Sequence, residues 1–193
     1  MLAERTVKDR LAALKPKDWE ARVAKVTANL PPDDAARQKL IEERKAAFNT
    51  TMANATNGAA VFTQVCAVCH QVGGQGALVG PQLDGIGNRG LERLLEDILD
   101  PNCNVDHAFR SQIVVLQDGD VVSGLVRREE GAVLVMVDST GKEVQITKAN
   151  IATRRESESS LMPDNFGEAM TPEQLRDLLG FLLSQAIANA AGK

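Results

Sequence analysis

The sequence predicts a mainly α-helical chain that carries a small β insertion. Apolar residues recur three or four positions apart in the first fifty residues, near residue 60, at 91–99 and close to the end, which is typical of helices. Between about 110 and 156, short segments rich in Val and Ile alternate with turn residues, which is typical of strands. With 44% hydrophobic and 25% charged residues, the 193-residue chain has the composition of a globular protein.

Residues 1–56 are predicted to form an N-terminal helical segment. Helices are expected at roughly 3–14, 18–29 and 33–50, because Pro16, Pro31 and Pro32 interrupt the pattern between them. The charge also changes near this boundary, from net +3 over residues 1–57 to net −7 over residues 58–193. We therefore expect a second region at 57–190, with the strands inserted at 110–156.

The second region is expected to open with a helix at Asn57-Gly58 that runs into the segment Cys66-Ala-Val-Cys69-His70. The glycine-rich stretch 73–87 predicts an ordered loop. A helix over 91–99 should stop before Pro101, which cannot continue it.

Five short strands are predicted at 111–117, 120–128, 132–138, 142–147 and 150–155. The residues between them, such as Asp118-Gly119 and Glu130-Gly131, are typical of hairpin turns, so we expect a small antiparallel sheet or barrel. The last helix should begin at Thr171-Pro172, which combines a hydroxyl cap with Pro at the first helical position, and end near 189.

Two of the three cysteines lie in Cys66-x-x-Cys69-His70, the pattern of c-type haem attachment. Two thiols a helical turn apart can add to the two vinyl groups of a porphyrin, and the adjacent imidazole can reach the iron. A zinc site completed by Cys103 and His107, a thiol redox pair and a chance occurrence are the alternatives. A zinc site needs a regularly spaced second ligand pair, and a redox pair normally begins a helix, whereas this motif ends one.

The residues around the motif resemble class I cytochromes c. Four segments carry the resemblance: Gly58-x-x-x-Phe62 before the motif, Gly80-Pro81-x-Leu83 as the haem-packing loop, Leu161-Met162-Pro163 as the axial-methionine segment, and 171–182 as the closing helix with its aromatic Phe181. The resemblance implies a helical fold around a covalently bound haem. It also implies that the first and last helices cross at Gly58, where a side chain would keep them apart.

The chain is most similar to the CxxCH haem-binding domain of multidomain proteins from planctomycetes and verrucomicrobia. This resemblance covers about residues 57–185 and rests on segments 74–81, 98–101, 118–124 and 160–163. It implies that residues 57–190 are a cytochrome c domain interrupted by the five-stranded sheet or barrel. Residues 1–56 would then be the tail of a preceding domain.

The axial ligands implied by the resemblance are His70 and Met162. Pro163 would stiffen the loop that presents the methionine sulfur. Met170, His107 and an open sixth position remain as alternatives. A His/Met pair would raise the reduction potential relative to two histidines.

Cys103 is not needed by the motif, and we expect it to be a buried thiol or to pair with another chain, but not to bind haem. The Asp, Glu and Ser residues form no recognisable catalytic set. We therefore expect no enzymatic activity from the chain itself, although it would suit a part of a larger oxidoreductase.

The leading functional interpretation is electron transfer by one covalently attached haem c, with electrons supplied by a dehydrogenase-like domain or partner. The first alternative is a haem-based sensor in which Met162 gives way to carbon monoxide or nitric oxide. The second is a docking module in which the strands and the helical segment bind neighbouring domains.

The composition also limits the partners and the compartment. A net charge of −4 argues against binding to nucleic acid. No run of apolar residues approaches 18 in length, so we expect no membrane insertion of this chain. A redox partner protein or domain is expected, and a homo-oligomer stays open. Because bacteria attach haem c outside the cytoplasm, the resemblance implies a periplasmic or otherwise exported protein. The N-terminus lacks the apolar core of a signal peptide, so we expect a piece of a longer precursor.

Overall fold

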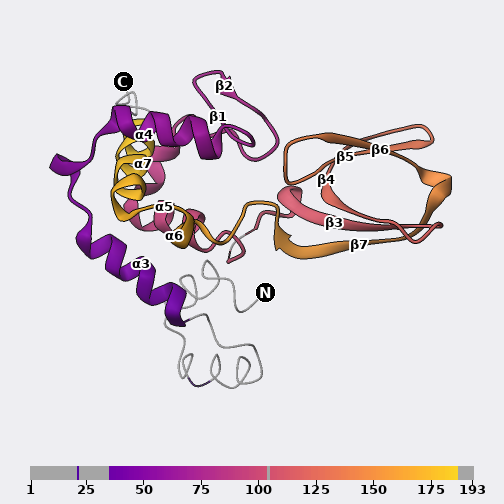
Figure 1. The fold of residues 1–193 in the computed structure, drawn as a ribbon, viewed down its shortest axis with the longest axis horizontal. Helices are drawn as coiled ribbons and strands as arrows, with labels where there is room; N and C mark the ends of the chain where they lie inside the picture. Colours follow the sequence, from indigo (N-terminus) through magenta and orange to yellow (C-terminus); the bar gives the residue numbers. More distant parts are fainter. Residues whose placement is uncertain (1–20, 22–34, 104, 187–193) are drawn as a thin grey trace.

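The computed structural model describes residue 21 and residues 35–103 and 105–186 of the chain. Its helices gather on one side and a five-stranded sheet stands on the other (Figure 1). The helices predicted at 3–14 and 18–29 lie outside the described residues, except for Ala21, which is helical. None of the described helices combines the length and the apolar character needed to cross a bilayer.

In the described part of the chain, the helical side contains four α-helices of seven or more residues, together with shorter elements. The α-helices are α3 (Ala35–Ala47), α5 (Gly90–Leu99), α7 (Pro172–Ser184) and α4 (Ala55–Val61), which continues as the π-helical turn η2 (Phe62–Cys66). The shorter elements of this side are the 3-10 turns η1 (Thr50–Met52) and η3 (Ile86–Arg89) and the one-turn helix α6 (Phe166–Ala169), whereas the 3-10 turn η4 (His107–Phe109) directly precedes the sheet. A two-stranded ribbon joins β1 (Gln71–Val72), which precedes the predicted glycine-rich loop, to β2 (Gln75–Gly76), which lies within it.

Helix α4 begins earlier than the sequence predicts. Its cap is Asn54, whose side-chain oxygen accepts the backbone N–H groups of Thr56 and Asn57 at 3.0 and 3.1 Å. Asn57, the predicted start, therefore lies inside the helix, because an equally good capping residue stands three positions before it.

Helix α7 begins where the sequence predicts. Thr171 and Gln174 form a reciprocal capping box, with Pro172 at the first position of the helix. The predicted end near residue 189 is wrong, because α7 ends at Ser184 with Gln185 as its C-terminal cap, before the described residues stop at 186.

Helices α4 and α7 cross at Gly58, as the resemblance implied. A Cβ atom at Gly58 would overlap the carbonyl oxygen of Asp177 and lie 2.8 Å from the Cβ of Phe181. Next to this crossing, the rings of Phe62 and Phe181 meet with centroids 5.5 Å apart. The absence of a side chain at residue 58 thus allows the backbones to approach and the two aromatic rings to pack.

Asp177 joins α7 to the start of α4. Its carboxylate accepts hydrogen bonds from the Asn54 backbone N–H at 3.1 Å and from Asn57 Nδ2 at 3.3 Å, and Arg176 lies 3.0 Å away. Burial raises the pKa of Asp177, but the hydrogen bonds from Asn54, Arg176 and Asn57 outweigh it and hold the pKa below its usual value. A negative charge at a helix N-terminus is also favoured by the helix dipole.

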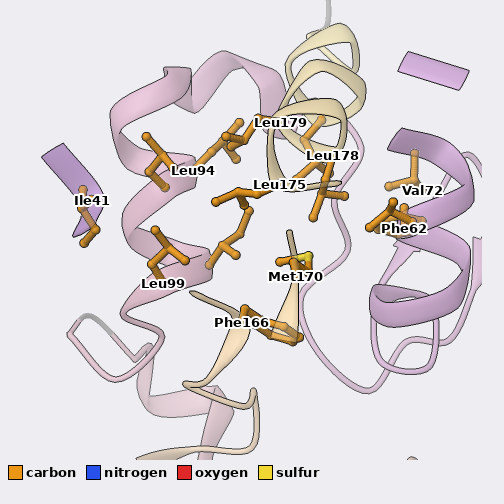
Figure 2. Close-up of a cluster of buried hydrophobic side chains, with 14 residues drawn as sticks. Ile41, Phe62, Val72, Leu94, Leu99, Phe166, Met170, Leu175, Leu178 and Leu179 are labelled. Carbon is orange, nitrogen blue, oxygen red and sulfur yellow. The ribbon is translucent and has the colours of Figure 1, made fainter. Parts of the chain in front are cut away.

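One apolar core unites the helices (Figure 2). Met170 lies among Phe166 and the leucines of α7, with Phe62 and Val72 on the other side. Ile41 of α3 is fully buried in the same core. Helix α3, which belongs to the segment predicted as the tail of a preceding domain, therefore shares the core of the region that follows it.

The five predicted strands are confirmed. They are β3 (Arg110–Leu116), β4 (Val121–Glu130), β5 (Val133–Val137), β6 (Glu143–Thr147) and β7 (Ile151–Ser160). All pairings are antiparallel in the order β6-β5-β4-β3-β7, and the tight turns place Gly119, Gly131 and Gly141 at positive φ.

Of the two predicted arrangements, a sheet or a barrel, the sheet is confirmed and the barrel is wrong. β6 and β7 are the two edge strands, and no ladder joins them within the described part of the chain. The 3-10 turn η5 (Lys148–Asn150) connects them and carries the chain from one edge of the curled sheet to the other. The sheet still has a core of its own, formed by Val114, Leu134, Met136 and Ile146.

We expect Gly58→Ala to lower the free energy of unfolding by about 1–3 kcal/mol or more, because α4 and α7 must separate to admit the methyl group. Urea denaturation of the haem-loaded protein measures the change. The matched control is Thr56→Ala, an exposed position of the same helix. Equal stability of the two variants would contradict the close crossing.

Candidate haem site

The CxxCH motif lies at the end of α4 and its continuation η2. The carbonyl oxygen of Cys66 accepts the backbone N–H groups of Cys69 at 3.0 Å and His70 at 2.9 Å. These two bonds wind residues 66–70 into a single turn. The two thiols and the imidazole therefore come from one compact stretch of backbone.

The glycine-rich segment folds back onto this motif through backbone hydrogen bonds. The carbonyl of Cys69 accepts the N–H groups of Val79 and Gly80 at 3.0 and 2.8 Å, and the carbonyl of Ala67 accepts that of Ala77 at 2.9 Å. A Cβ atom at Gly76 would overlap the carbonyl oxygen of His70. The predicted loop is thus ordered because its backbone is bonded directly to the motif.

His70 is held in an orientation that suits a metal ligand. Its Nδ1 lies 2.8 Å from the carbonyl oxygen of Pro81, which has no proton to give, so Nδ1 donates and Nε2 is left for a metal. Burial lowers the pKa of His70, against an opposing effect of the bond to Pro81, and this favours the neutral, ligating imidazole. A Cβ atom at Gly80 would lie 2.8 Å from Cε1 of the ring, so this glycine makes room for the imidazole.

The two cysteines of the motif are thiols, and neither is in a disulfide. Burial, assisted by the neighbouring Cys69, raises the pKa of Cys66 to about 12, and burial also raises the pKa of Cys69. Both groups are therefore protonated at neutral pH, unlike the low-pKa cysteines of thiol redox sites.

Both candidate methionine ligands belong to the apolar cluster that Cys66 also contacts. Met162 is partly buried, and its backbone N–H donates to Ser160 Oγ at 3.1 Å. Met170 is more deeply buried, with 7% of its surface exposed. The sixth ligand thus stays a prediction, with Met162 in the less buried position.

His107 and Cys103 lie apart from this arrangement. The His107 side chain is 82% exposed, and its Nε2 lies 3.3 Å from a carboxylate oxygen of Glu156, in the sheet region. Cys103 is partly buried and is not in a disulfide. Among the residues that the structure describes, no three or more His, Cys, Asp or Glu side chains come together as metal ligands, so no zinc set appears there.

The inserted sheet touches the haem-attachment motif. Leu125 of β4 and Val137 of β5 form a buried cluster with Val79, against which Cys69 and Leu161 pack. In addition, a Cβ atom at Gly141, in the turn between β5 and β6, would lie 3.1 Å from the carbonyl oxygen of Val68. The insertion therefore covers the Cys69 side of the motif.

Two features of the site escaped the sequence analysis. The carbonyl oxygen of Pro81 orients His70, but a backbone acceptor leaves no signal in the side-chain pattern. Arg37 of α3 reaches Asp164, two residues after Met162, at 3.4 Å. No local pattern links two residues so far apart in the chain.

Residues 55–111 match the family model described as Cytochrome c. The match covers less than a third of the chain, and it ends at the second residue of β3, where the inserted sheet begins. No curated protein matches the chain.

The geometry and the match agree on the class of site. The matched segment contains both cysteines, His70 and the Pro81 carbonyl, and a cytochrome c domain implies covalently bound haem c and haem-based electron transfer. The residues fit this group, because they supply two thiols, a neutral imidazole with one free nitrogen, and a glycine cradle for the ring. The match supports a cytochrome c family for this segment.

Gly80→Ala should displace the His70 ring and break its hydrogen bond to Pro81, because the new methyl group occupies the ring's place. We expect a partial change from low-spin to high-spin absorption in the haem-loaded protein, together with a lower melting temperature. Leu78→Ala, an exposed position in the same loop, serves as the control. A Gly80→Ala spectrum identical to that of the control would contradict the proposed packing.

Proposed function

We propose that the chain is an electron-transfer module with one haem c attached to Cys66 and Cys69, and with His70 and Met162 as its axial ligands. The observation that carries this proposal is the hydrogen bond from His70 Nδ1 to the Pro81 carbonyl, 2.8 Å long, beside two thiols on the same turn. When bound, haem c carries one electron at its iron, which alternates between Fe(II) and Fe(III).

Each residue has a separate task in this proposal. Cys66 and Cys69 anchor the group, and the Pro81 carbonyl fixes the tautomer and the plane of the His70 ring. Phe62 and the apolar core exclude water from one side of the site. Met162 supplies a thioether, which stabilises the reduced state more than a second imidazole would and so raises the potential.

We further propose that a dehydrogenase-like domain or protein supplies the electrons, on the basis of the family resemblance. Cytochrome c domains are typically exported or periplasmic, and this supports an exported location. The chain then acts as a relay, and no catalytic residue is assigned to it.

The charge distribution indicates which side of the molecule faces a redox partner. Residues 110–160 hold 7 basic and 8 acidic residues. Many of these charges neutralise one another through ion pairs such as Arg128–Glu143 and Arg154–Glu129. By contrast, the described residues of the helical side, 35–103, 105–109 and 161–186, together hold 7 basic and 12 acidic residues. The helical side, which holds the haem motif, therefore attracts a basic partner surface.

The first test is the visible spectrum of protein produced with the haem-attachment machinery. We expect haem that survives denaturation and extraction, a low-spin reduced spectrum, and a long-wavelength sulfur-to-iron band in the oxidised state. Met162→Ala should abolish that band, whereas the control Met170→Ala should keep it. Extractable haem, or no haem, would contradict the proposed attachment to Cys66 and Cys69.

The same preparation separates electron transfer from small-ligand sensing. A reduced protein that resists carbon monoxide at neutral pH fits a closed, His/Met-ligated relay. Rapid carbon monoxide binding would instead favour the sensor interpretation, because the sixth ligand must then detach easily.

Electron transfer to a basic acceptor protein should slow as salt is added, because ions screen the acidic helical side beyond about 10 Å at 0.1 M. Stopped-flow rates between 10 and 300 mM sodium chloride measure the effect. A small neutral oxidant serves as the control and should be insensitive to salt. A rate with the basic acceptor that is equally insensitive would contradict electrostatic steering.

A further inference from the structure

The segment that carries Met162 is held at its N-terminal end by the inserted sheet. It follows β7 directly, and the backbone N–H of Ser160 donates to Asn102 Oδ1 at 2.8 Å. The hydroxyl of Ser111 on β3 donates to the carbonyl of Ser159 at 2.7 Å. These bonds fix the point at which the chain leaves the sheet for Met162.

The other end of this segment is held by α3. One guanidinium nitrogen of Arg37 lies 3.4 Å from the carboxylate of Asp164, and another lies 3.0 Å from that of Asp100. Asp100 caps the end of α5. A planar guanidinium can donate to two acceptors at once, which a lysine ammonium does with less geometric control. Arg37 therefore joins the methionine segment to the end of α5.

Helix α3 is itself firmly attached to the core. Ile41 is fully buried, and Leu40 packs so closely over α6 that a Cβ atom at Gly167 would lie 2.6 Å from its Cδ2. Near the other end of α3, the ammonium of Lys45 lies 3.1 Å from Glu92 of α5. Arg37 thus extends from a helix that is anchored at several points.

We propose that Arg37 is a positioning residue for the sixth ligand: by holding Asp164 against the end of α5, it keeps Met162 in place at the haem iron. This inference rests on the proposed function, because it assumes that Met162 is the ligand. Helix α3 is consequently coupled to the position of Met162, since displacing α3 withdraws Arg37 from Asp164.

Asp164→Asn tests the proposal with the least disturbance, because it weakens only the ion pair between Arg37 and Asp164 and leaves the ion pair between Arg37 and Asp100. Carbon monoxide uptake by the reduced protein reports the fraction of molecules in which the sulfur is detached. We expect a rise of about two- to fivefold in Asp164→Asn and about five- to tenfold in Arg37→Gln, as estimated for the loss of one exposed ion pair or of that pair together with the less exposed one to Asp100. The long-wavelength band should disappear at a lower temperature in both.

Two controls remove a charge without touching this contact. Glu168→Gln removes an exposed acid from the neighbouring helix α6, and Lys39→Gln removes an exposed base from α3. Hydrogen exchange of peptides covering 160–167 gives a second readout, which should accelerate in Asp164→Asn and stay unchanged in both controls. If Arg37→Gln fails to fold, Asp164→Asn and its control still decide the question.

The outcomes separate the two proposals. A wild-type protein that shows the band, and keeps the same carbon monoxide uptake in Asp164→Asn and in a folded Arg37→Gln, overturns the positioning role and leaves Met162 as the ligand. A wild-type protein without the band, or one whose band survives Met162→Ala, overturns the ligation and the positioning role together. An equal rise in carbon monoxide uptake in the control Glu168→Gln would show that the effect comes from the change in overall charge, and this would also overturn the positioning role.

Discussion

The carbonyl oxygen of Cys69 accepts two backbone hydrogen bonds, from Val79 and Gly80, and the candidate haem site depends on them. They bring the glycine-rich loop back to the motif, so that the Pro81 carbonyl stands within 2.8 Å of His70 Nδ1. Gly80 donates one of these hydrogen bonds and is also the residue against which the imidazole packs. Closure of the loop and orientation of the His70 ring are therefore coupled. The imidazole is thus prepared for a metal by the backbone, and no charged side chain is needed to orient it.

The two sides of the site are built in different ways. The side of His70 is local, because the motif and its loop lie within about twenty residues and fold onto each other through short-range bonds. The side of Met162 is assembled from distant parts of the chain: α3 provides Arg37, the turn after α5 provides Asn102, and β7 leads into the methionine. Contacts between distant residues cost more loop entropy and open more readily. The methionine side is therefore the more easily displaced of the two.

Sequence reasoning recovered the features with local causes. Hairpin turns such as Asp118-Gly119, the capping box at Thr171 and the thiol spacing of Cys66 and Cys69 each act within a few residues. The cap of α4 was misplaced because Asn54 and Asn57 are equally suitable as residue types, and the tertiary contact of Asp177 with the Asn54 N–H selects the former. Barrel closure depends on whether two edge strands meet, and the contact of Arg37 with Asp164 joins distant residues. Neither leaves a periodic signal along the chain.

The entry and exit of the inserted sheet lie side by side. Asn102, ahead of β3, bonds to Ser160 at the end of β7, and Arg110 pairs with Ser160 across the ladder. An insertion whose two ends lie together disturbs the surrounding helices little, because the helices do not have to move apart to accommodate it. The sheet is therefore a separate structural unit inserted at a single junction of the helical fold. The sheet nevertheless contributes contacts that a different insertion would have to replace, because Leu125 and Val137 pack with Val79 beside Cys69.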